Sequence, residues 1–259
     1  MDNFYDILAD CYDSWQKDND PSEWASYINT IINKYGPKTG DGENNSLILV
    51  DLGCGTGKVT GKLYDMGYDA IGIDSSYMML NKAMDLSYEE GKQILWLNQD
   101  ITEYELYGTA DVFISLLDTV NHLSGIEDLE KIFASFKNYM NPDGIFIFDV
   151  GTERHFAKTL ANNVFFVDEE NYTLLWVNNY NPDERVNKAE ITLFENENSE
   201  DELYSRYDGT ITEKFITEEE IMEAAKKNGL CIKAILGNMS EDAPKEDDER
   251  IFYVIGKEK

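Results

Sequence analysis

The sequence predicts an α/β protein with a doubly wound, mostly parallel sheet and a ligand site at one edge of that sheet. Residues 47–50 are continuously apolar and run into a glycine-rich turn, which is typical of a buried parallel strand. A second apolar run over residues 70–73 ends at Asp74, and the pattern of residues 58–66 predicts a short helix between the two strands. This arrangement places the turn where open α/β folds bind ligands, with a carboxylate positioned to accept hydrogen bonds from ribose hydroxyls.

The spacing of the glycines distinguishes between kinds of nucleoside site. Gly53, Gly55 and Gly57 alternate, and Asp51 precedes them. A dinucleotide-binding loop reads G-x-G-x-x-G, so its third glycine would fall at position 58, which is Lys58 here. A phosphate-binding loop of the form G-x-x-x-x-G-K-[ST] does not occur in the chain. The spacing therefore argues against a dinucleotide site and excludes a Walker phosphate loop.

The remaining elements continue the alternation of strands and helices. A helix capped by a serine begins after Asp74, and a helix over residues 217–228 begins with a capping box and ends at Gly229. A capping sequence at residues 20–23 precedes a helix over residues 24–34, and a shorter helical pattern covers residues 4–13. Further strands are predicted over residues 94–97, 111–117, 145–149, 231–236 and 251–255.

The ordered motifs over about residues 45–150 resemble the class I S-adenosylmethionine-dependent methyltransferases of the small-molecule type. The resemblance rests on the G-x-G-x-G turn after Asp51, the acid at Asp74, the segment around Asp100 and the loop that follows residues 111–117. It implies a seven-stranded, Rossmann-like sheet whose last strand is antiparallel, and S-adenosyl-L-methionine as the cofactor. The opening Tyr-x-x-x-Ala-x-x-Tyr-Asp, from Tyr5 to Asp13, is similar to family members that fold this segment over the cofactor as a helical lid.

The resemblance also implies roles for individual residues. The expected cofactor-binding residues are Tyr5, Tyr12, Asp51, Gly53, Cys54, Gly55, Gly57, Asp74, Ser75, Met79, Gln99, Asp100, Ile101 and Leu116. The candidates near the transferred methyl group are Asp118, Asn121 and His122, where a carboxylate or imidazole could take a proton from the acceptor. No metal is required, although a magnesium site from Asp118, Asn121 and Asp149 stays open as an alternative.

Residues 164–216 change to a period of two, which predicts three or four antiparallel strands inserted in the α/β core. We expect this insertion to cap the methyl group, with Trp176, Tyr180, Arg206 and Tyr207 as candidate substrate contacts. The predicted domains are an N-terminal helical lid over 1–40, a core over 41–163 and 217–259, and the cap over 164–216.

Composition limits the classes of partner. The 259 residues include 22 Lys and Arg against 51 Asp and Glu, a net charge of −29, so nucleic acid and anionic membranes are not expected as partners. A cationic or amine-bearing substrate is easier to attract to such a surface. Cys11, Cys54 and Cys231 are too few and too widely spaced for a disulfide framework, which together with the absence of a signal peptide or membrane-length apolar run predicts a cytoplasmic protein.

The predicted function is transfer of a methyl group to a nitrogen or oxygen atom of a small-molecule acceptor. Two alternatives remain at this point: an NAD-linked oxidoreductase, and a non-catalytic module that binds S-adenosylmethionine. A pocket under the cap with room for an acceptor would favour the enzyme over the binding module. The sequence leaves open whether the protein is a monomer or a homodimer.

Overall fold

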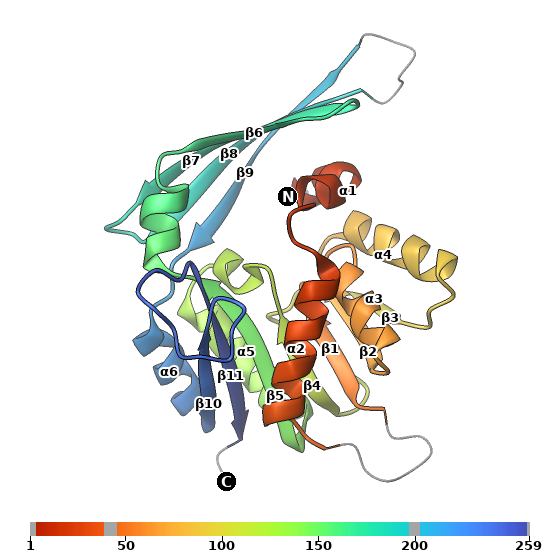
Figure 1. The fold of residues 1–259 in the computed structure, drawn as a ribbon, viewed down its shortest axis with the longest axis vertical. Coiled ribbons are helices and arrows are strands. Elements are labelled where there is room, and N and C mark those ends of the chain that lie inside the picture. The colour runs from red at the N-terminus through yellow and green to blue at the C-terminus, as the bar shows by residue number, and fades with distance from the viewer. Residues whose placement is uncertain (1–3, 39–45, 197–202, 258–259) are drawn as a thin grey trace.

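The computed structural model describes residues 4–38, 46–196 and 203–257, and Figure 1 shows how its two sheets are arranged. The strands of the larger sheet are β1 (Ile48–Leu52), β2 (Asp69–Asp74), β3 (Leu95–Asn98), β4 (Ala110–Ser115), β5 (Met140–Gly151), β10 (Leu230–Gly237) and β11 (Arg250–Lys257). The smaller sheet contains β6 (Val164–Asp168), β7 (Tyr172–Asn181), β8 (Val186–Glu195) and β9 (Ser205–Lys214). The helices are α1 (Phe4–Trp15), α2 (Pro21–Tyr35), α3 (Lys58–Asp65), α4 (Tyr77–Glu89), α5 (Ile126–Tyr139) and α6 (Glu218–Lys227), with short helical segments η1 (Thr119–His122) and η2 (His155–Leu160).

The larger sheet confirms the predicted fold class. Its strand order is β10-β11-β5-β4-β1-β2-β3, and β11 lies antiparallel to both of its neighbours, β5 and β10. The predicted first strand lies near the middle, with Leu49 and Val50 fully buried, as expected for a continuously apolar strand covered on both faces. The order reverses between β1 and β4, so the carboxyl ends of these two strands flank the crevice where ligands bind in such sheets.

The fifth strand differs in detail from its prediction. β5 begins at Met140, before the predicted turn at residues 141–144, because Met140 already pairs with Ala110. The register then shifts, and Ile145 pairs with Val112, so residues 141–144 form an irregularity within the strand. The apolar run after this irregularity is buried, as predicted.

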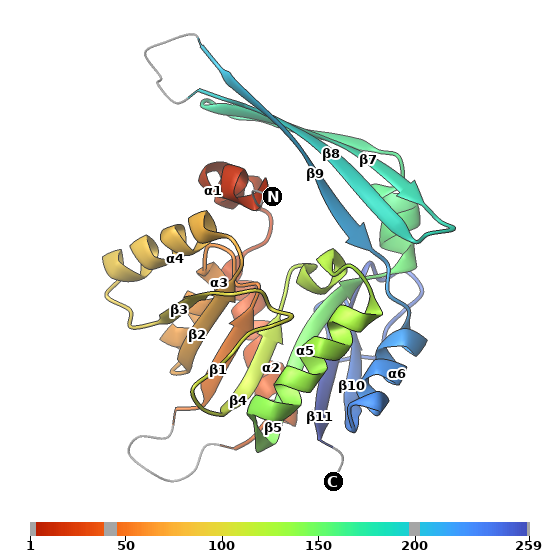
Figure 2. The same cartoon turned by 180° about the vertical axis from the view of Figure 1, so that it is seen from behind.

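Helices cover both faces of the larger sheet (Figures 1 and 2). One face packs on α5 and α6, and the other packs on α2 and α3. Within the predicted N-terminal segment, α2 therefore belongs to a core layer, since Ile28, Ile31 and Ile32 are buried with residues of β5 and β11. The prediction did not assign α5 as an element. The proposed domain boundaries stay a prediction.

Helix α1 lies between the larger sheet's carboxyl edge and the four-stranded sheet, which arches over it (Figure 1). Leu8 and Cys11 are buried against Leu174, Ile191 and Leu193 of the smaller sheet. The insertion thus has an apolar face that α1 covers. In the described part of the chain, no helix combines the length and apolar character needed to cross a membrane.

Candidate active site

The turn after β1 adopts left-handed backbone conformations at each of its three glycines. The φ angles are +79°, +53° and +74° at Gly53, Gly55 and Gly57 respectively. A Cβ atom at Gly53 would lie 2.4 Å from Thr119, and one at Gly57 would lie 2.4 Å from Trp96. At Gly55 the side-chain atom nearest to such a Cβ belongs to Tyr12 of α1, at 3.9 Å, so of these three glycines only Gly55 leaves room for a Cβ atom. Two of the glycines therefore serve close packing within the chain, while Gly55 borders the cavity.

Asp74 joins the glycine turn to the end of β2. Its Oδ2 accepts a hydrogen bond from the Gly55 backbone N–H at 2.8 Å, and its Oδ1 accepts one from the Ser76 N–H at 2.8 Å. Burial raises the pKa of Asp74 above its ordinary value, and the backbone N–H donors oppose that effect. A carboxylate has about four acceptor positions. Asp74 therefore retains capacity to accept further donors from a molecule in the adjoining cavity.

That cavity has a volume of about 560 Å³. It brings together many of the predicted cofactor-binding residues, namely Tyr5, Tyr12, Gly53, Gly55, Asp74, Ser75, Met79, Asp100 and Ile101. Met79 is 2% exposed and provides an apolar wall. Gln99 does not line it, because its side chain accepts from the Glu105 backbone N–H at 2.7 Å and donates to the Glu105 carbonyl at 3.3 Å. Gln99 instead shapes the loop that carries Asp100.

A smaller cavity of about 310 Å³ also borders the glycine turn. The predicted residues Asp51, Cys54 and Leu116 line it, together with Gly53 and Gly55, whereas Gly57 lines neither of these two cavities. Asp51 is 3% exposed and accepts a hydrogen bond from the Thr60 hydroxyl at 2.6 Å. Burial raises the pKa of Asp51 to about 7.

A third cavity, of about 650 Å³, lies beneath the four-stranded sheet, and we refer to it as the cap cavity. Its aromatic lining consists of Tyr5, Tyr12, Trp15, Phe165, Phe166 and Trp176, and its ionisable lining includes Lys17, Asp18, Asp118, His122, His155 and Glu213. Tyr12 and Leu117 line all three cavities. The three cavities therefore meet at α1 and at the turn that follows β4.

The turn after β4 is held in an unusual conformation by a buried ionic cluster. Leu117 and Asp118 both have positive φ angles, 58° and 65°. Their backbone N–H groups donate to the Asp149 carboxylate at 2.8 and 3.1 Å. Arg250 donates to Asp149 and to Asp118 Oδ2, the latter at 2.7 Å. Non-glycine residues in the left-handed region are uncommon and cost free energy. The hydrogen bonds and ion pairs of this cluster therefore stabilise a strained backbone turn next to the cavities.

Two carboxylates and one guanidinium leave the cluster with an excess negative charge. Burial raises the pKa of Asp149. Burial acts in the same direction on Asp118, but the Arg250 guanidinium outweighs it and lowers the pKa of Asp118. Arg250 thereby keeps the carboxylate of Asp118 ionised, and Asp118 lines the cap cavity. The guanidinium of Arg250 pairs with both carboxylates. It therefore lies where the alternative magnesium site would place its ion.

His122 connects the same turn to α1 and to the insertion. Its Nδ1 lies 3.3 Å from the Thr212 carbonyl oxygen, which can only accept, so Nδ1 carries the hydrogen. Nε2 then presents its lone pair to the Tyr5 hydroxyl, 3.1 Å away. Burial raises the pKa of Tyr5 well above its ordinary value, which keeps the hydroxyl protonated. Asp118 and His122, two of the three candidates near the methyl group, thus reach the cap cavity.

Asn121, the third candidate, lines none of these cavities. Its amide nitrogen donates to the Lys214 carbonyl at 2.8 Å, and its amide oxygen accepts from the Gly151 N–H at 2.9 Å. Asn121 is fully buried. Its side chain therefore links η1 to β5 and β9, and these contacts give it a structural role.

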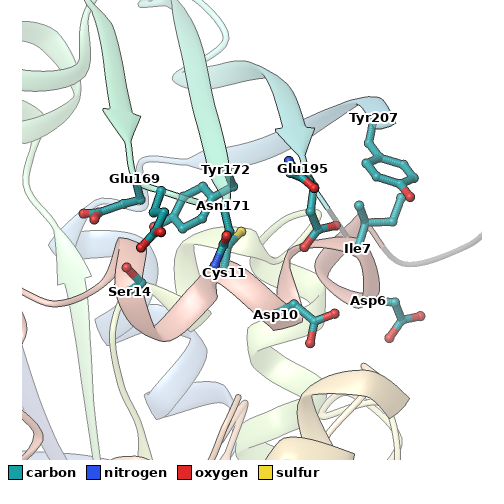
Figure 3. Close-up of a pocket in the computed structure, with 12 residues that line it drawn as sticks. Asp6, Ile7, Asp10, Cys11, Ser14, Glu169, Asn171, Tyr172, Glu195 and Tyr207 are labelled. Carbon is teal, nitrogen blue, oxygen red and sulfur yellow. The ribbon is translucent and has the colours of Figure 1, made fainter. Parts of the chain in front are cut away.

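Of the candidate substrate contacts, the structure brings only Trp176 to the cap cavity. Tyr180 packs on Phe156 with ring centroids 5.8 Å apart, and Arg206 is exposed and pairs with Asp208 at 2.9 Å. Tyr207 lines a different cavity of about 890 Å³ on another face of α1, where Asp6, Asp10 and Glu195 also lie (Figure 3). A period of two identifies the two faces of a strand but not the cavity that each residue reaches, which explains these differences.

Several lining residues were not among the predicted site residues, notably Trp15, Phe165, His155 and Glu213, and neither was Arg250 of the ionic cluster. Trp15 is the last residue of the helix that carries Tyr5 and Tyr12. Its helical spacing from these two tyrosines could therefore have predicted that it lines the same cavity. Arg250 and Glu213 come from β11 and β9, far from residue 118 in the sequence. No local pattern connects them to that turn.

This chain is similar to a known protein family, to named proteins by sequence and to a solved structure. Residues 49–144 match the family described as a methyltransferase domain. The Bacillus subtilis (strain 168) protein named "Putative methyltransferase YqeM" is 25% identical over 256 residues, which cover 98% of each chain. The glycine/sarcosine N-methyltransferase of Halorhodospira halochloris is 32% identical over 108 residues, or 39% of this chain and 38% of that protein. A solved S-adenosylmethionine-dependent methyltransferase from Clostridium acetobutylicum ATCC 824 has a TM-score of 0.82 and 26% identity, covering 98% of this chain and 99% of its own.

Proposed function

Since the chain is a class I S-adenosylmethionine-dependent methyltransferase, we propose that it methylates a nitrogen or oxygen atom of a small molecule bound in the cap cavity. One observation carries this proposal: the cavities beside the glycine turn and the cap cavity meet at Tyr12 and Leu117. A cofactor in the first two cavities would then present its methyl group to an acceptor in the third. The connection favours an enzyme over a module that only binds the cofactor.

The residues around the glycine turn fit S-adenosylmethionine. The adenosine part fits the cavity of about 560 Å³, where Asp74 has acceptor capacity for ribose hydroxyls and Met79 offers an apolar surface for the base. The methionine part fits the smaller cavity beside Gly55 and Cys54. Tyr12 borders both cavities, and an aromatic ring there attracts a sulfonium by roughly 0.5–2 kcal/mol.

The cofactor supplies an activated methyl group when it is bound, so the protein's main contribution is to orient the acceptor and exclude water. The cap cavity is suited to that contribution because α1 and the four-stranded sheet line it with aromatic side chains. Its volume of about 650 Å³ is within the range of small-molecule sites. His122 presents a lone pair at Nε2 to the Tyr5 hydroxyl. A proton released by the methyl acceptor can therefore be transferred to His122 through Tyr5.

We expect Asp74→Ala to weaken the binding of S-adenosylmethionine by roughly 10- to 100-fold, since hydrogen bonds to a charged group contribute about 1.5–3 kcal/mol. Isothermal titration with S-adenosylmethionine, S-adenosylhomocysteine and NAD measures this effect. Asp69→Ala is the matched control, because Asp69 is an exposed aspartate at the opposite end of the same strand. Unchanged affinity in Asp74→Ala would contradict the proposed cofactor contact, and binding of NAD in place of S-adenosylmethionine would overturn the function.

A further inference from the structure

We propose that the methyl acceptor is an amine that enters the cap cavity as a cation and is held by the carboxylate of Asp118, with Glu213 as a second anionic contact. This inference rests on the proposed function and narrows it from a nitrogen or oxygen acceptor to a nitrogen acceptor. Three independent features of the cavity carry it: an incompletely paired carboxylate, an excess of negative charge and an aromatic lining.

The carboxylate of Asp118 lacks one of its expected partners. Oδ2 pairs with Arg250, but Oδ1 is buried and has no hydrogen-bond partner among the described residues. Buried polar atoms in proteins are nearly always hydrogen-bonded, because an unpaired one has lost its contacts with water without gaining a partner. Asp118 lines the cap cavity, and 21% of its side chain is exposed. Oδ1 itself is covered, so a small shift of the Asp118 side chain would expose it to an N–H donor on a molecule in this cavity, which would supply the missing partner.

The charges around the cap cavity favour a cation. Asp18, Asp118 and Glu213 line it, whereas the lining lysine, Lys17, pairs with Glu169 at 2.7 Å. The two lining histidines are also engaged, His122 by Tyr5 and Thr212, and His155 by Glu249 at 3.6 Å. Asp118 also belongs to the ionic cluster, which as a whole keeps one excess negative charge because Arg250 neutralises only one of its two carboxylates. An ammonium group is attracted to this site and a carboxylate is repelled.

The aromatic lining favours an amine with an apolar body. Trp15 of α1 and Trp176 of β7 meet edge to face with ring centroids 5.5 Å apart, and Phe165 stacks on Trp176 at 5.2 Å. Tyr5 and Tyr12 complete the wall nearest the glycine turn. Aromatic faces bind hydrocarbon and also attract ammonium groups. The expected acceptor is therefore an alkyl or arylalkyl amine without a carboxylate.

An ammonium must lose a proton before its nitrogen can accept a methyl group. The Tyr5 hydroxyl can receive that proton while it passes its own hydrogen to Nε2 of His122, 3.1 Å away, and the imidazole then returns a proton to water. The nitrogen lone pair forms the new N–C bond as the C–S bond of the cofactor breaks and its electron pair stays on sulfur. Atoms and charge balance, because the sulfonium charge is lost and the methylated amine carries the positive charge.

Isosteric probes test the acceptor class directly. We would measure binding to the full chain saturated with S-adenosylhomocysteine, and turnover with S-adenosylmethionine, for benzylamine, benzyl alcohol and benzoate and for cyclohexylamine, cyclohexanol and cyclohexanecarboxylate. The expected result is that amines bind and are methylated while the alcohols and carboxylates are not. Methylation of an alcohol, or equal binding of an amine and its alcohol, overturns the inference, as does the failure of every amine to bind at millimolar concentration. Failure of S-adenosylhomocysteine to bind would instead overturn the proposed function.

Charge-neutralising variants test the two carboxylates. Asp118→Asn and Glu213→Gln should each raise the KM or Kd for the amine about tenfold, while affinity for S-adenosylhomocysteine stays within about twofold of wild type. Asp208→Asn is the matched control, because Asp208 lies on the same strand as Glu213 but is exposed outside the cavity. Glu213→Gln leaves Arg250 untouched, so it remains informative where Asp118→Asn lowers stability. Unchanged amine affinity in both variants overturns the inference.

Discussion

Four aspartates around the site differ in the partner that each carboxylate has. Asp51 is buried with a single hydroxyl donor, Asp74 accepts from two backbone N–H groups, and Asp118 and Asp149 share Arg250. The residue type is the same, but the surroundings raise the pKa of Asp51 and lower that of Asp118. At this scale the chemistry depends on desolvation and on the nearest donors, and both effects can be measured by replacing one carboxylate with its amide.

Asp51→Asn should change the pH dependence of stability. The folded-state pKa of Asp51 is raised from 3.8 to about 7, so between these values the folded state holds a proton that the unfolded state has lost. The free energy of unfolding attributable to Asp51 therefore decreases as pH rises, by roughly 1.4 kcal/mol per pH unit, until it levels off near pH 7. Urea denaturation at pH 5 and pH 7.5 should show the variant gaining stability relative to wild type. Parallel pH profiles for wild type and Asp51→Asn, with exposed Asp69→Asn as reference, would contradict this expectation.

At the scale of elements, α1 has two different faces. Its apolar side is buried against the four-stranded sheet, whereas acidic residues on its other side reach the core. Asp6 accepts from the Ser76 hydroxyl at 2.6 Å, and Asp13 accepts from the Thr56 hydroxyl at 2.6 Å and pairs with Lys58 at 3.2 Å. The helix therefore joins the insertion to the glycine turn and to the start of α4, and its position controls how the cavities are closed.

Asp13→Ala should weaken cofactor binding, because Asp13 lines the smaller cavity and holds α1 against the glycine turn, while the cavity of about 560 Å³ keeps all of its lining residues. The variant loses one hydrogen bond and one partly exposed ion pair that hold α1 against the glycine turn, together about 0.5–2 kcal/mol. We expect the Kd for S-adenosylhomocysteine to rise by roughly 2- to 30-fold, mainly through faster dissociation, as stopped-flow fluorescence would record. Glu23→Ala on the exposed side of α2 is the control. A dissociation rate equal to that of wild type would show that α1 does not depend on this contact for closure.

At the scale of the whole molecule, acidic residues exceed basic ones by more than two to one, and the net charge is −29. The ion pairs of the described residues, such as Lys17–Glu169 and Lys82–Asp10, engage only part of that excess. Like charges on a compact surface repel one another, which favours the unfolded chain. The same field attracts cations, in agreement with the acceptor class that we propose.

Added salt should stabilise this protein. Raising sodium chloride from about 10 mM to 150 mM shortens the screening length from about 30 Å to about 8 Å, so surface repulsion weakens. The midpoint of thermal unfolding should increase by roughly 2–4 °C for each kcal/mol of repulsion removed. Differential scanning calorimetry in sodium chloride and in potassium chloride separates screening from ion-specific effects. Screening depends only on ionic strength, so the two salts should raise the midpoint equally. A midpoint that is flat or falls with salt would show that repulsion does not limit stability.

The sequence by itself determined most of the elements, α5 excepted, and the identity of the cofactor. Its signals there are local: the glycine spacing, the apolar strands, the acid at Asp74 and the capping box at Thr217, which the structure shows with both reciprocal hydrogen bonds. Such features depend on neighbouring residues in the chain, so composition and spacing reveal them. They also predict the doubly wound sheet and an insertion of three or four antiparallel strands, of which the structure shows four.

Only the tertiary structure decided which side chains share the cap cavity. It brings Arg250 of β11 to Asp118 and Glu213 of β9 to the cap cavity, while the contacts of Gln99, Asn121 and Tyr180 hold them away from the cavities where binding or catalysis was expected. These outcomes depend on strand register and on packing between residues far apart in the sequence. A shift of one residue in a strand moves each side chain to the opposite face, and no local pattern specifies which face meets α1.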